Sequence, residues 1–393
     1  MSSSDPGVGS AGLVRRQTVT LFEPPHSLPL DCGACLGPVT LAYQTYGTLS
    51  PERDNAILIL HALSGDAHVA GYHDPNDRRP GWWDGLVGPG KGFDTDRYFI
   101  VCSNVIGGCQ GSTGPGSIDP ATGRPFGLRF PVITIGDMVR AQRGLMEHLG
   151  IPRWLCVSGG SMGGMQALQW AVDYPDLVES AIPLGACLRE SAQAIAFNEV
   201  GRRAIMTDPR WRNGEYYDDG DRPTDGLAVA RMIGHITYLS EPSMEAKFGR
   251  RLRGKTRYDY SLRGIEFEVE SYLKHQGDSF NARFDANSYL YITRAMDYFD
   301  LLIDEASVAR LSGIKARFLV ISITSDWLYP TAQSIEIVET LRRHGVDARH
   351  WEMESILGHD AFLLEDRLLA PQIGEFLESV RASRPARAGR SAG

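Results

Sequence analysis

The feature that most constrains the fold is a Gly-x-Ser-x-Gly sequence between a strand-like run and a helix-like run. Residues 159–163 read GGSMG, after the β-type run 154–158 (WLCVS) and before the helix-forming run 165–174 (MQALQWAVDY). Glycines let the backbone pass where side chains would clash, so a serine on such a strand-to-helix turn is pushed above the sheet. We interpret Ser161 as a nucleophile. The alternative is a chance match in a glycine-rich chain, with the serine as a spectator.

A serine nucleophile needs a base and an orienting carboxylate, which follow it in the order acid, then histidine, in this kind of fold. The apolar run 317–322 predicts a buried strand that places Asp326 just past its end, at the sheet edge where catalytic groups of α/β folds gather. His359 lies in a glycine-led loop between a strand at 348–353 and a terminal helix at 362–380. We predict Asp326 as the acid and His359 as the base. Taken alone, Asp326 would more often be a solvated loop acid or a helix cap than a member of a triad.

Backbone amides that follow two of the predicted strands are candidate donors to an oxyanion. Met162 directly follows the nucleophile, and Leu63 lies in the loop after the apolar strand 56–60. Each such donor contributes about 10²- to 10³-fold to the rate of acyl transfer. We therefore predict that Leu63 and Met162 form the oxyanion hole. We expect His61, in the same loop as Leu63, to hydrogen-bond to neighbouring loops and to take no part in the chemistry.

Alternating strands and helices predict an α/β fold: a mostly parallel, eight-stranded sheet with helices on both faces and an antiparallel start. The β-type segments are 17–22, 39–46, 56–60, 98–104, 154–158, 178–184, 317–323 and 348–353, and the clearest helices between them are 135–149 and 331–344.

A long helical stretch interrupts this alternation. Residues 187–309 contain helical patterns, notably at 226–239 and 267–276, and no clear strand. We interpret this stretch as a lid inserted after the sixth strand, because lids of this kind exclude water and select substrates. Residues 15–186 and 310–380 then form one core. The ends, 1–14 and 381–393, are small, polar and rich in glycine or proline, and we expect both to be disordered tails.

Composition excludes several classes of function. The 393 residues include 40 basic and 48 acidic ones, so no broad basic surface is expected for nucleic acid, and a small-molecule substrate is favoured. No apolar run approaches the roughly 20 residues that span a bilayer and no signal peptide is apparent, so we expect a cytoplasmic protein without membrane association. The six cysteines do not suggest a disulfide framework, and the CxxC formed by Cys32 and Cys35 has no second pair. We expect no bound metal or cofactor.

Six longer blocks resemble the homoserine O-acyltransferases of the α/β-hydrolase superfamily. They are 44–47 (QTYG), 61–65 (HALSG), 104–115 (NVIGGCQGSTGP), 130–139 (FPVITIGDMV), 159–166 (GGSMGGMQ) and 283–290 (RFDANSYL), and the similarity runs from about residue 15 to about residue 380. The resemblance implies an α/β-hydrolase core and a ping-pong transfer of an acyl group from acyl-CoA to the hydroxyl of L-homoserine, in methionine biosynthesis. One departure is Gly116, where many relatives have a serine; it removes no catalytic group.

The same resemblance assigns residues to the acceptor. In the family, an arginine of the lid holds the acceptor carboxylate, and the acid after the catalytic histidine binds the acceptor amine. The block 230–238 (ARMIGHITY) gives these roles to Arg231, with Tyr238 nearby, and to Asp360. From sequence alone, Arg231 would be an exposed helix charge and Asp360 a helix N-cap.

The resemblance also implies a homodimer through the lid and an acyl-CoA co-substrate. Acetyl-CoA is favoured over succinyl-CoA, although no residue in the sequence distinguishes these donors, or homoserine from serine as the acceptor. A plain esterase would keep the triad without needing Arg231 and Asp360 around an acceptor. A catalytically silent binding protein of the same fold would be expected to lack a triad member, and none is missing.

Overall fold

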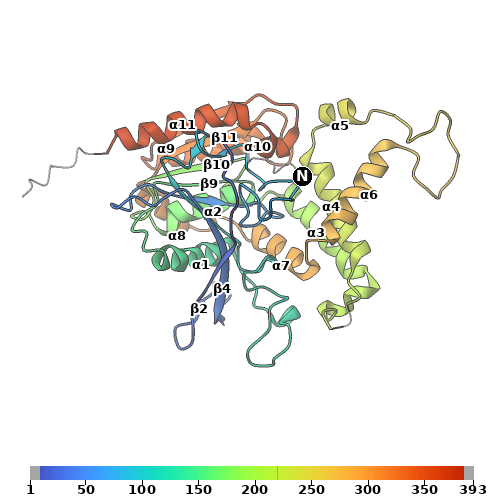
Figure 1. Cartoon of the computed structure of the whole chain (residues 1–393), viewed down its shortest axis with the longest axis horizontal. Coiled ribbons are helices and arrows are strands. Elements are labelled where there is room, and N and C mark those ends of the chain that lie inside the picture. Colours follow the sequence, from blue (N-terminus) through green and yellow to red (C-terminus); the bar gives the residue numbers. More distant parts are fainter. Residues whose placement is uncertain (1–8, 219, 385–393) are drawn as a thin grey trace, which may run out of the picture.

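The computed structural model describes residues 9–218 and 220–384, and its centre is an eight-stranded sheet between layers of helices (Figure 1). In spatial order the strands are β1 (Gln17–Leu21), β4 (Val39–Tyr46), β8 (Phe99–Ser103), β5 (Ala56–Leu60), β9 (Cys156–Gly160), β10 (Ser180–Leu184), β11 (Arg317–Ile323) and β12 (Ala348–Met353). Strand β4 is antiparallel to both of its neighbours, and the other strands pair in parallel. The mostly parallel α/β sheet predicted from the sequence is confirmed.

The central strands β5, β9 and β10 are buried along their whole length because both faces of the sheet are covered. In β5, Leu58 and Leu60 pack into the cluster that contains α1 (Ile135–His148), α2 (Met162–Asp173) and α9 (Thr331–Arg343). Ile57 and Ile59 point the other way, into the cluster that contains α11 (Asp366–Ala382). Figure 1 shows α11 on one side of the sheet and α1 on the other.

The stretch between β10 and β11 supplies most of the other helices. They are α3 (Ala192–Thr207), α4 (Thr224–Tyr238), α5 (Glu241–Lys247), α6 (Glu268–Asn281), α7 (Ala286–Asp297) and α8 (Glu305–Arg310). Figure 1 shows α3 to α6 grouped beside the sheet, whereas α7 lies closer to the core. Tyr291 of α7 donates a hydrogen bond of 2.6 Å to the carbonyl of Phe130, which ties this helix to the core.

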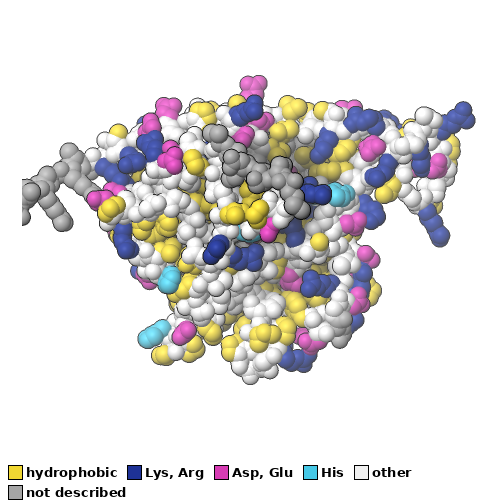
Figure 2. Space-filling view, in the orientation of Figure 1, with side chains coloured by type: hydrophobic (Ala, Val, Ile, Leu, Met, Phe, Trp, Pro, Cys, Tyr) yellow, Lys and Arg dark blue, Asp and Glu magenta, His cyan; other side chains and the backbone are white. Residues whose placement is uncertain are grey.

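Short elements complete the chain. They are the paired strands β2 (Leu28–Pro29) and β3 (Cys35–Leu36), the paired strands β6 (Val87–Gly88) and β7 (Phe93–Asp94), the 3-10 helices η1 (Gly127–Arg129), η2 (Pro209–Gly214), η3 (Leu311–Gly313) and η4 (Gly358–Asp360), and α10 (Ala361–Leu364). On the face shown in Figure 2, acidic and basic side chains are interspersed over the core, and basic ones are more frequent on the segment that projects between α5 and α6.

The structure corrects several predicted boundaries. Helix α2 begins at Met162, earlier than the predicted start at 165. The glycines of its first turn have a low helix propensity, but close packing requires them there, because added side chains would clash with neighbouring atoms. The terminal helix predicted at 362–380 is divided at Glu365 into α10 and α11, and α11 continues to Ala382. At the other end, Val14 donates a backbone hydrogen bond to Tyr72, so the folded part begins before residue 15. Residues 1–8 and 385–393 of the predicted tails lie outside the described residues.

Neither a membrane-spanning helix nor a metal-binding cluster is present among the described residues. None of these helices combines the length and hydrophobicity required to cross a membrane. No group of three or more His, Cys, Asp or Glu side chains in the described ranges is arranged to hold a metal ion. Cys102, Cys156 and Cys187 are buried, as expected for packing residues.

Candidate active site

Ser161 occupies a sharp turn between β9 and α2. Its backbone has φ 58° and ψ −124°, a conformation that non-glycine residues rarely adopt and that is found mainly at functional sites. The flanking glycines make the turn sterically possible: a Cβ at Gly159 or Gly163 would lie 2.2 or 2.1 Å from the carbonyl oxygen of Leu60. The Ser161 N–H donates to the carbonyl of Leu184 at 2.9 Å, which fastens the turn to β10.

Asp326 and His359 form a buried hydrogen-bonded pair. The Nδ1 of His359 lies 2.6 Å from Oδ2 of Asp326, while Oδ1 of Asp326 accepts the N–H groups of Leu328 at 3.0 Å and Tyr329 at 2.9 Å. A side chain at Gly185, at the end of β10, would press on this pair, since a Cβ there would lie 3.3 Å from both Asp326 Oδ2 and His359 Cε1.

The protonation of His359 reflects two opposing effects. Burial alone lowers the pKa of an imidazole, but the charge and hydrogen bond of Asp326 outweigh burial and raise the pKa of His359 above its ordinary value. Its Nε2 is buried and has no hydrogen-bond partner among the described residues, so no hydrogen bond joins it to Ser161. The arrangement therefore leaves Nε2 available to a reacting group.

A small cavity of about 40 Å³ adjoins Ser161. Its walls include Leu63, Glu190, Tyr238, Leu328 and Tyr329, and its described lining residues include no lysine or arginine. The amides of Leu63 and Met162 donate no hydrogen bond to a described residue outside their own elements, and Met162 is the first residue of α2, where an N–H has no acceptor within the helix.

Two arginines converge on the loop after β5. Arg231 donates from Nη1 to the Ser64 hydroxyl at 3.1 Å, and Arg283 donates from Nη1 to the Ser64 carbonyl at 2.8 Å. Their guanidinium carbons lie 4.7 and 5.2 Å from the centre of the Phe280 ring. Within the described part of the chain, neither arginine forms an ion pair, and the buried Nε of Arg231 has no partner. Positive charge thus accumulates beside the loop of Leu63.

Asp360 and Tyr238 lie close to His359. Asp360 follows it in η4, and its carboxyl forms neither a cap for α10 nor an ion pair with a described residue. Burial raises the pKa of Asp360, although the charges of His359 and Arg231 oppose this effect. The ring of Tyr238 lies 6.1 Å from that of His359, and burial raises the pKa of the Tyr238 phenol. Asp360 therefore occupies the N-cap position of α10, as the sequence alone suggests, but its carboxyl makes no capping hydrogen bond.

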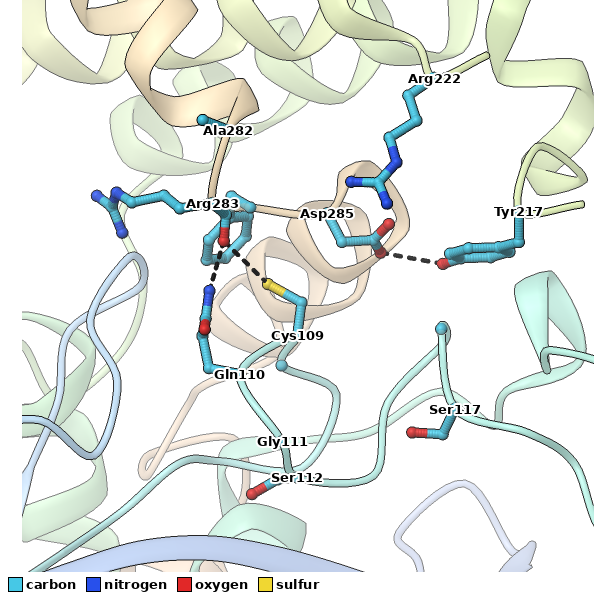
Figure 3. A pocket seen from close by; sticks show the side chains of 13 residues that line it. Cys109, Gln110, Gly111, Ser112, Ser117, Tyr217, Arg222, Ala282, Arg283 and Asp285 are labelled. Carbon is cyan, nitrogen blue, oxygen red and sulfur yellow. Dashed lines mark hydrogen bonds between the residues drawn. The ribbon is translucent and has the colours of Figure 1, made fainter. Parts of the chain in front are cut away.

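A second, larger cavity of about 530 Å³ opens between the loop after β8 and the connection from α6 to α7 (Figure 3). The blocks 104–115 and 283–290 meet here, and Cys109 and Gln110 both donate to the carbonyl of Arg283. Arg222 is exposed in its wall and has no ion pair with a described residue. The Asp285 carboxylate accepts a hydrogen bond of 3.0 Å from Tyr217, as Figure 3 shows. At Gly116, where the sequence differs from many relatives, a Cβ would lie 3.3 Å from the Tyr217 ring.

Two residues show what the sequence interpretation captured and what it missed. His61 bonds through Nδ1 to the carbonyl of Ala62 at 2.8 Å and accepts the Val105 N–H at Nε2 at 3.1 Å, as expected for a residue that holds loops together. Glu190, in the wall of the Ser161 cavity, was not among the predicted site residues. It follows the end of β10, so the strand-end rule that selected Asp326 would also have selected it.

Comparisons with known proteins agree with this geometry. A family profile described as the alpha/beta hydrolase fold matches residues 55–365. The chain is 55% identical to a homoserine O-acetyltransferase of Solidesulfovibrio magneticus, over 95% of this chain and 94% of that protein. It is 54% identical to a homoserine O-succinyltransferase of Magnetococcus marinus, over 95% of this chain and 96% of that protein.

Two solved structures have the same fold as this chain. The crystal structure of homoserine O-acetyltransferase from Bacillus anthracis aligns with a TM-score of 0.86 and 32% identity, over 93% of this chain and 98% of that one. The crystal structure of esterase E22 aligns with a TM-score of 0.84 and 31% identity, over 93% of this chain and 100% of that one.

Proposed function

This chain belongs to the homoserine O-acyltransferase family of the alpha/beta hydrolase fold, and we propose that it transfers an acyl group from acyl-CoA to the hydroxyl of L-homoserine. The observation that carries the proposal is the buried pair of His359 and Asp326, 2.6 Å apart, which leaves Nε2 of the histidine without a partner next to a strained serine turn. That arrangement supports nucleophilic catalysis by Ser161.

The reaction proceeds in two halves. Ser161 Oγ attacks the thioester carbonyl while its proton passes to His359 Nε2, and the Leu63 and Met162 amides stabilise the oxyanion. The C–S bond breaks, the CoA sulfur takes the proton from His359, and Ser161 carries the acyl group as an ester. The homoserine hydroxyl then gives its proton to His359 and attacks this ester. The bond between the acyl carbon and Ser161 Oγ breaks, His359 returns the proton to Oγ, and O-acylhomoserine leaves.

The acceptor site lies at the edge of this centre. Homoserine is a small zwitterion with little apolar surface, so its binding depends on charge-assisted hydrogen bonds of roughly 1.5–3 kcal/mol each. Arg231 carries a buried Nε without a partner, and Asp360 carries a carboxyl without an ion pair among the described residues. We assign the acceptor carboxylate to Arg231, the amine to Asp360, and a place beside the acceptor to Tyr238.

The cavity beside Ser161 favours acetyl as the acyl group. Its volume of about 40 Å³ is a few times the roughly 10–15 Å³ that one water needs by this measure, which suits the three heavy atoms of an acetyl group better than the seven of succinyl. Its described lining also offers no lysine or arginine to a succinyl carboxylate.

The larger cavity of Figure 3 suits the phosphate-bearing part of the coenzyme. Its lining residues include Arg222 and Arg283, neither of which forms an ion pair with a described residue, and one carboxylate, that of Asp285. Coenzyme phosphates would supply the missing negative charge. Arg283 also bonds to Ser64, so it connects this cavity to the loop of the oxyanion donor Leu63.

A partition experiment tests the proposal. Acetyl-CoA alone should release one equivalent of thiol in a burst and leave an acetyl group on Ser161 by mass spectrometry, whereas Ser161→Ala should show neither. Homoserine should then accelerate turnover. We expect Arg231→Ala and Asp360→Ala to acylate at near-normal rates but to transfer at least roughly ten times more slowly at low homoserine concentration, because only the second half-reaction uses these charges.

The same measurements distinguish an acyltransferase from a hydrolase. An esterase would discharge the acetyl-enzyme to water as fast without homoserine as with it, and the Arg231 and Asp360 variants would leave the homoserine titration unchanged. Serine in place of homoserine tests the alternative acceptor under identical conditions.

A further inference from the structure

Glu190 is a buried carboxyl group without a basic partner. Only 7% of the residue is exposed, and it lines the cavity beside Ser161. Its two carboxylate oxygens accept the Tyr329 hydroxyl at 3.0 and 3.2 Å, and Oε2 lies 3.5 Å from the Cys187 thiol. It forms no ion pair with lysine or arginine in the described part of the chain. Burying a carboxylate without a cation is costly, so such a group in the wall of a cavity is a candidate for a functional role.

Main-chain contacts fix the position of Glu190. Its N–H donates to the carbonyl of Phe299 at 2.9 Å, and Leu301 donates to the carbonyl of Leu188 at 2.9 Å. These two bonds clamp the segment after β10 against the segment after α7. The Tyr329 that holds the carboxylate also donates its N–H to Asp326, so Glu190 is attached to the same framework as the catalytic pair.

We propose that Glu190 determines donor specificity: its carboxylate excludes acyl groups that end in a negative charge from the cavity beside Ser161, so that short neutral acyl groups are transferred. This inference rests on the proposed function. The cavity would then select acyl groups by their charge as well as by their size. The two effects can be separated, because a neutral acyl group with the carbon chain of succinyl is disfavoured by its size alone.

The ionisation of Glu190 makes this selection by charge dependent on pH. Burial raises its pKa to about 7, although the hydrogen bonds from Tyr329 and Cys187 oppose this effect. The other charged groups that act on it are Asp297 of α7, which raises its pKa further, and His359, which lowers it. Glu190 is therefore mostly neutral at pH 6 and mostly ionised at pH 8, and exclusion of anionic acyl groups should strengthen as pH rises.

The test is the ratio of kcat/KM for succinyl-CoA to that for acetyl-CoA, measured between pH 6 and pH 8. Both donors use the same Ser161 and His359, and the succinyl carboxylate stays ionised throughout, so the ratio cancels the titration of the catalytic groups. With a pKa near 7, the ratio should fall about tenfold from pH 6 to pH 8. Butyryl-CoA, which has the same four-carbon chain as succinyl-CoA but no terminal carboxylate, should give a ratio to acetyl-CoA that does not change with pH.

Two variants complete the test. Glu190→Gln, which keeps the shape, should make the succinyl ratio independent of pH and about tenfold higher than wild type at pH 8. Glu336→Gln removes a partly exposed carboxylate that pairs with Arg189 at 3.7 Å outside the cavity, and it should keep the wild-type profile. A flat wild-type ratio, or the same slope in Glu190→Gln, would overturn the inference. Loss of transfer from every donor in wild type would instead refute the proposed function.

Discussion

His359 shows how a single residue balances two large effects. Burial favours the neutral imidazole, whereas the Asp326 carboxylate 2.6 Å away favours the imidazolium, and the carboxylate prevails. The raised pKa makes His359 a stronger base toward Ser161 and homoserine. However, His359 must be neutral before each half-reaction starts.

The pH dependence of acylation follows from this balance. Because His359 must be neutral to accept the Ser161 proton and its pKa is raised, kcat/KM for acetyl-CoA should fall on the acid side with a midpoint above the ordinary value of about 6.5. In Asp326→Asn burial lowers the pKa of the imidazole and is opposed only by the charges of Asp360 and Glu190, so the midpoint should move to lower pH, with a rate loss on the order of 10⁴-fold.

The measurement is burst acylation from pH 5 to pH 9, together with an NMR titration of His359 in Ser161→Ala and in Ser161→Ala with Asp326→Asn. An unchanged acid limb and an unchanged titration in the Asn variants would mean that Asp326 is not the group that sets the pKa of His359.

Local sequence rules select most of these residues but not all. Ser161, Asp326 and His359 follow strand ends within a few positions, so short-range patterns indicate them. Glu190 also follows a strand end, but its burial and its bond to Tyr329 are not visible in local sequence, because they depend on the pairing of residues 188–190 with 299–301, more than a hundred residues apart. Local sequence likewise does not show that Arg231 and Arg283 converge on Ser64, since this depends on how the lid meets the loop after β5.

At the scale of elements, strands were predicted better than helix ends. The runs that became β4, β5, β11 and β12 had the predicted bounds. For β5 and β11 the reason is that strands buried on both faces are continuous in apolar residues. The start of α2 was missed since its glycines are poor helix formers held in a helix by tertiary packing. The break at Glu365 carries no glycine or proline signal at that position, so no local rule indicated it.

Gly163 offers a test of the turn that links β9 to α2. A methyl group on Gly163 would lie 2.1 Å from the carbonyl oxygen of Leu60, and backbone cannot move aside as a flexible side chain can. We expect Gly163→Ala to lower the free energy of unfolding by about 1–3 kcal/mol and to slow acylation, because the shift displaces Ser161.

Gly374 is the matched control. It lies inside α11 with no atom within 4 Å of an added Cβ, so Gly374→Ala should raise the free energy of unfolding by about 0.5–1 kcal/mol and leave acylation unchanged. Urea denaturation followed by circular dichroism measures both variants. If Gly163→Ala were as stable and as active as wild type, the close approach to Leu60 would not be what requires glycine in this turn.

The whole molecule places its functions on two sides of one loop. Arg231 and Arg283 both donate hydrogen bonds to Ser64, which follows Leu63 in the loop after β5. Leu63 lines the cavity beside Ser161, and Arg283 lines the larger cavity of Figure 3. The predicted lid thus contributes residues both to the candidate active site and to the proposed coenzyme site. An apolar groove with exposed Ile236 and Trp327 lies between residues 236–244 of the lid and the loop after β11, and the homodimer through the lid stays a prediction.

Arg222 tests the coenzyme site without disturbing the catalytic centre. Arg283 is unsuitable for this purpose, because its bond to the Ser64 carbonyl would mix coenzyme binding with the position of Leu63. Arg222 is exposed and unpaired among the described residues. A charge-assisted bond from such a partly solvated group contributes on the order of 1 kcal/mol, so Arg222→Ala should raise the KM for acetyl-CoA by about threefold to tenfold.

Its effect should be confined to the phosphates of the donor. Acetyl-pantetheine carries the same thioester but no phosphate, so its kcat/KM should be equal in wild type and Arg222→Ala, and kcat with acetyl-CoA should also be unchanged because the lost interaction is the same in the ground and transition states. Arg349→Ala, which removes an exposed arginine on the edge strand β12, should leave kcat/KM for both donors unchanged.

The ratio of kcat/KM for acetyl-CoA to that for acetyl-pantetheine should also fall with added salt in wild type, and less so in Arg222→Ala. If Arg222→Ala weakened both donors equally, or neither, the coenzyme phosphates would have to bind elsewhere on the molecule.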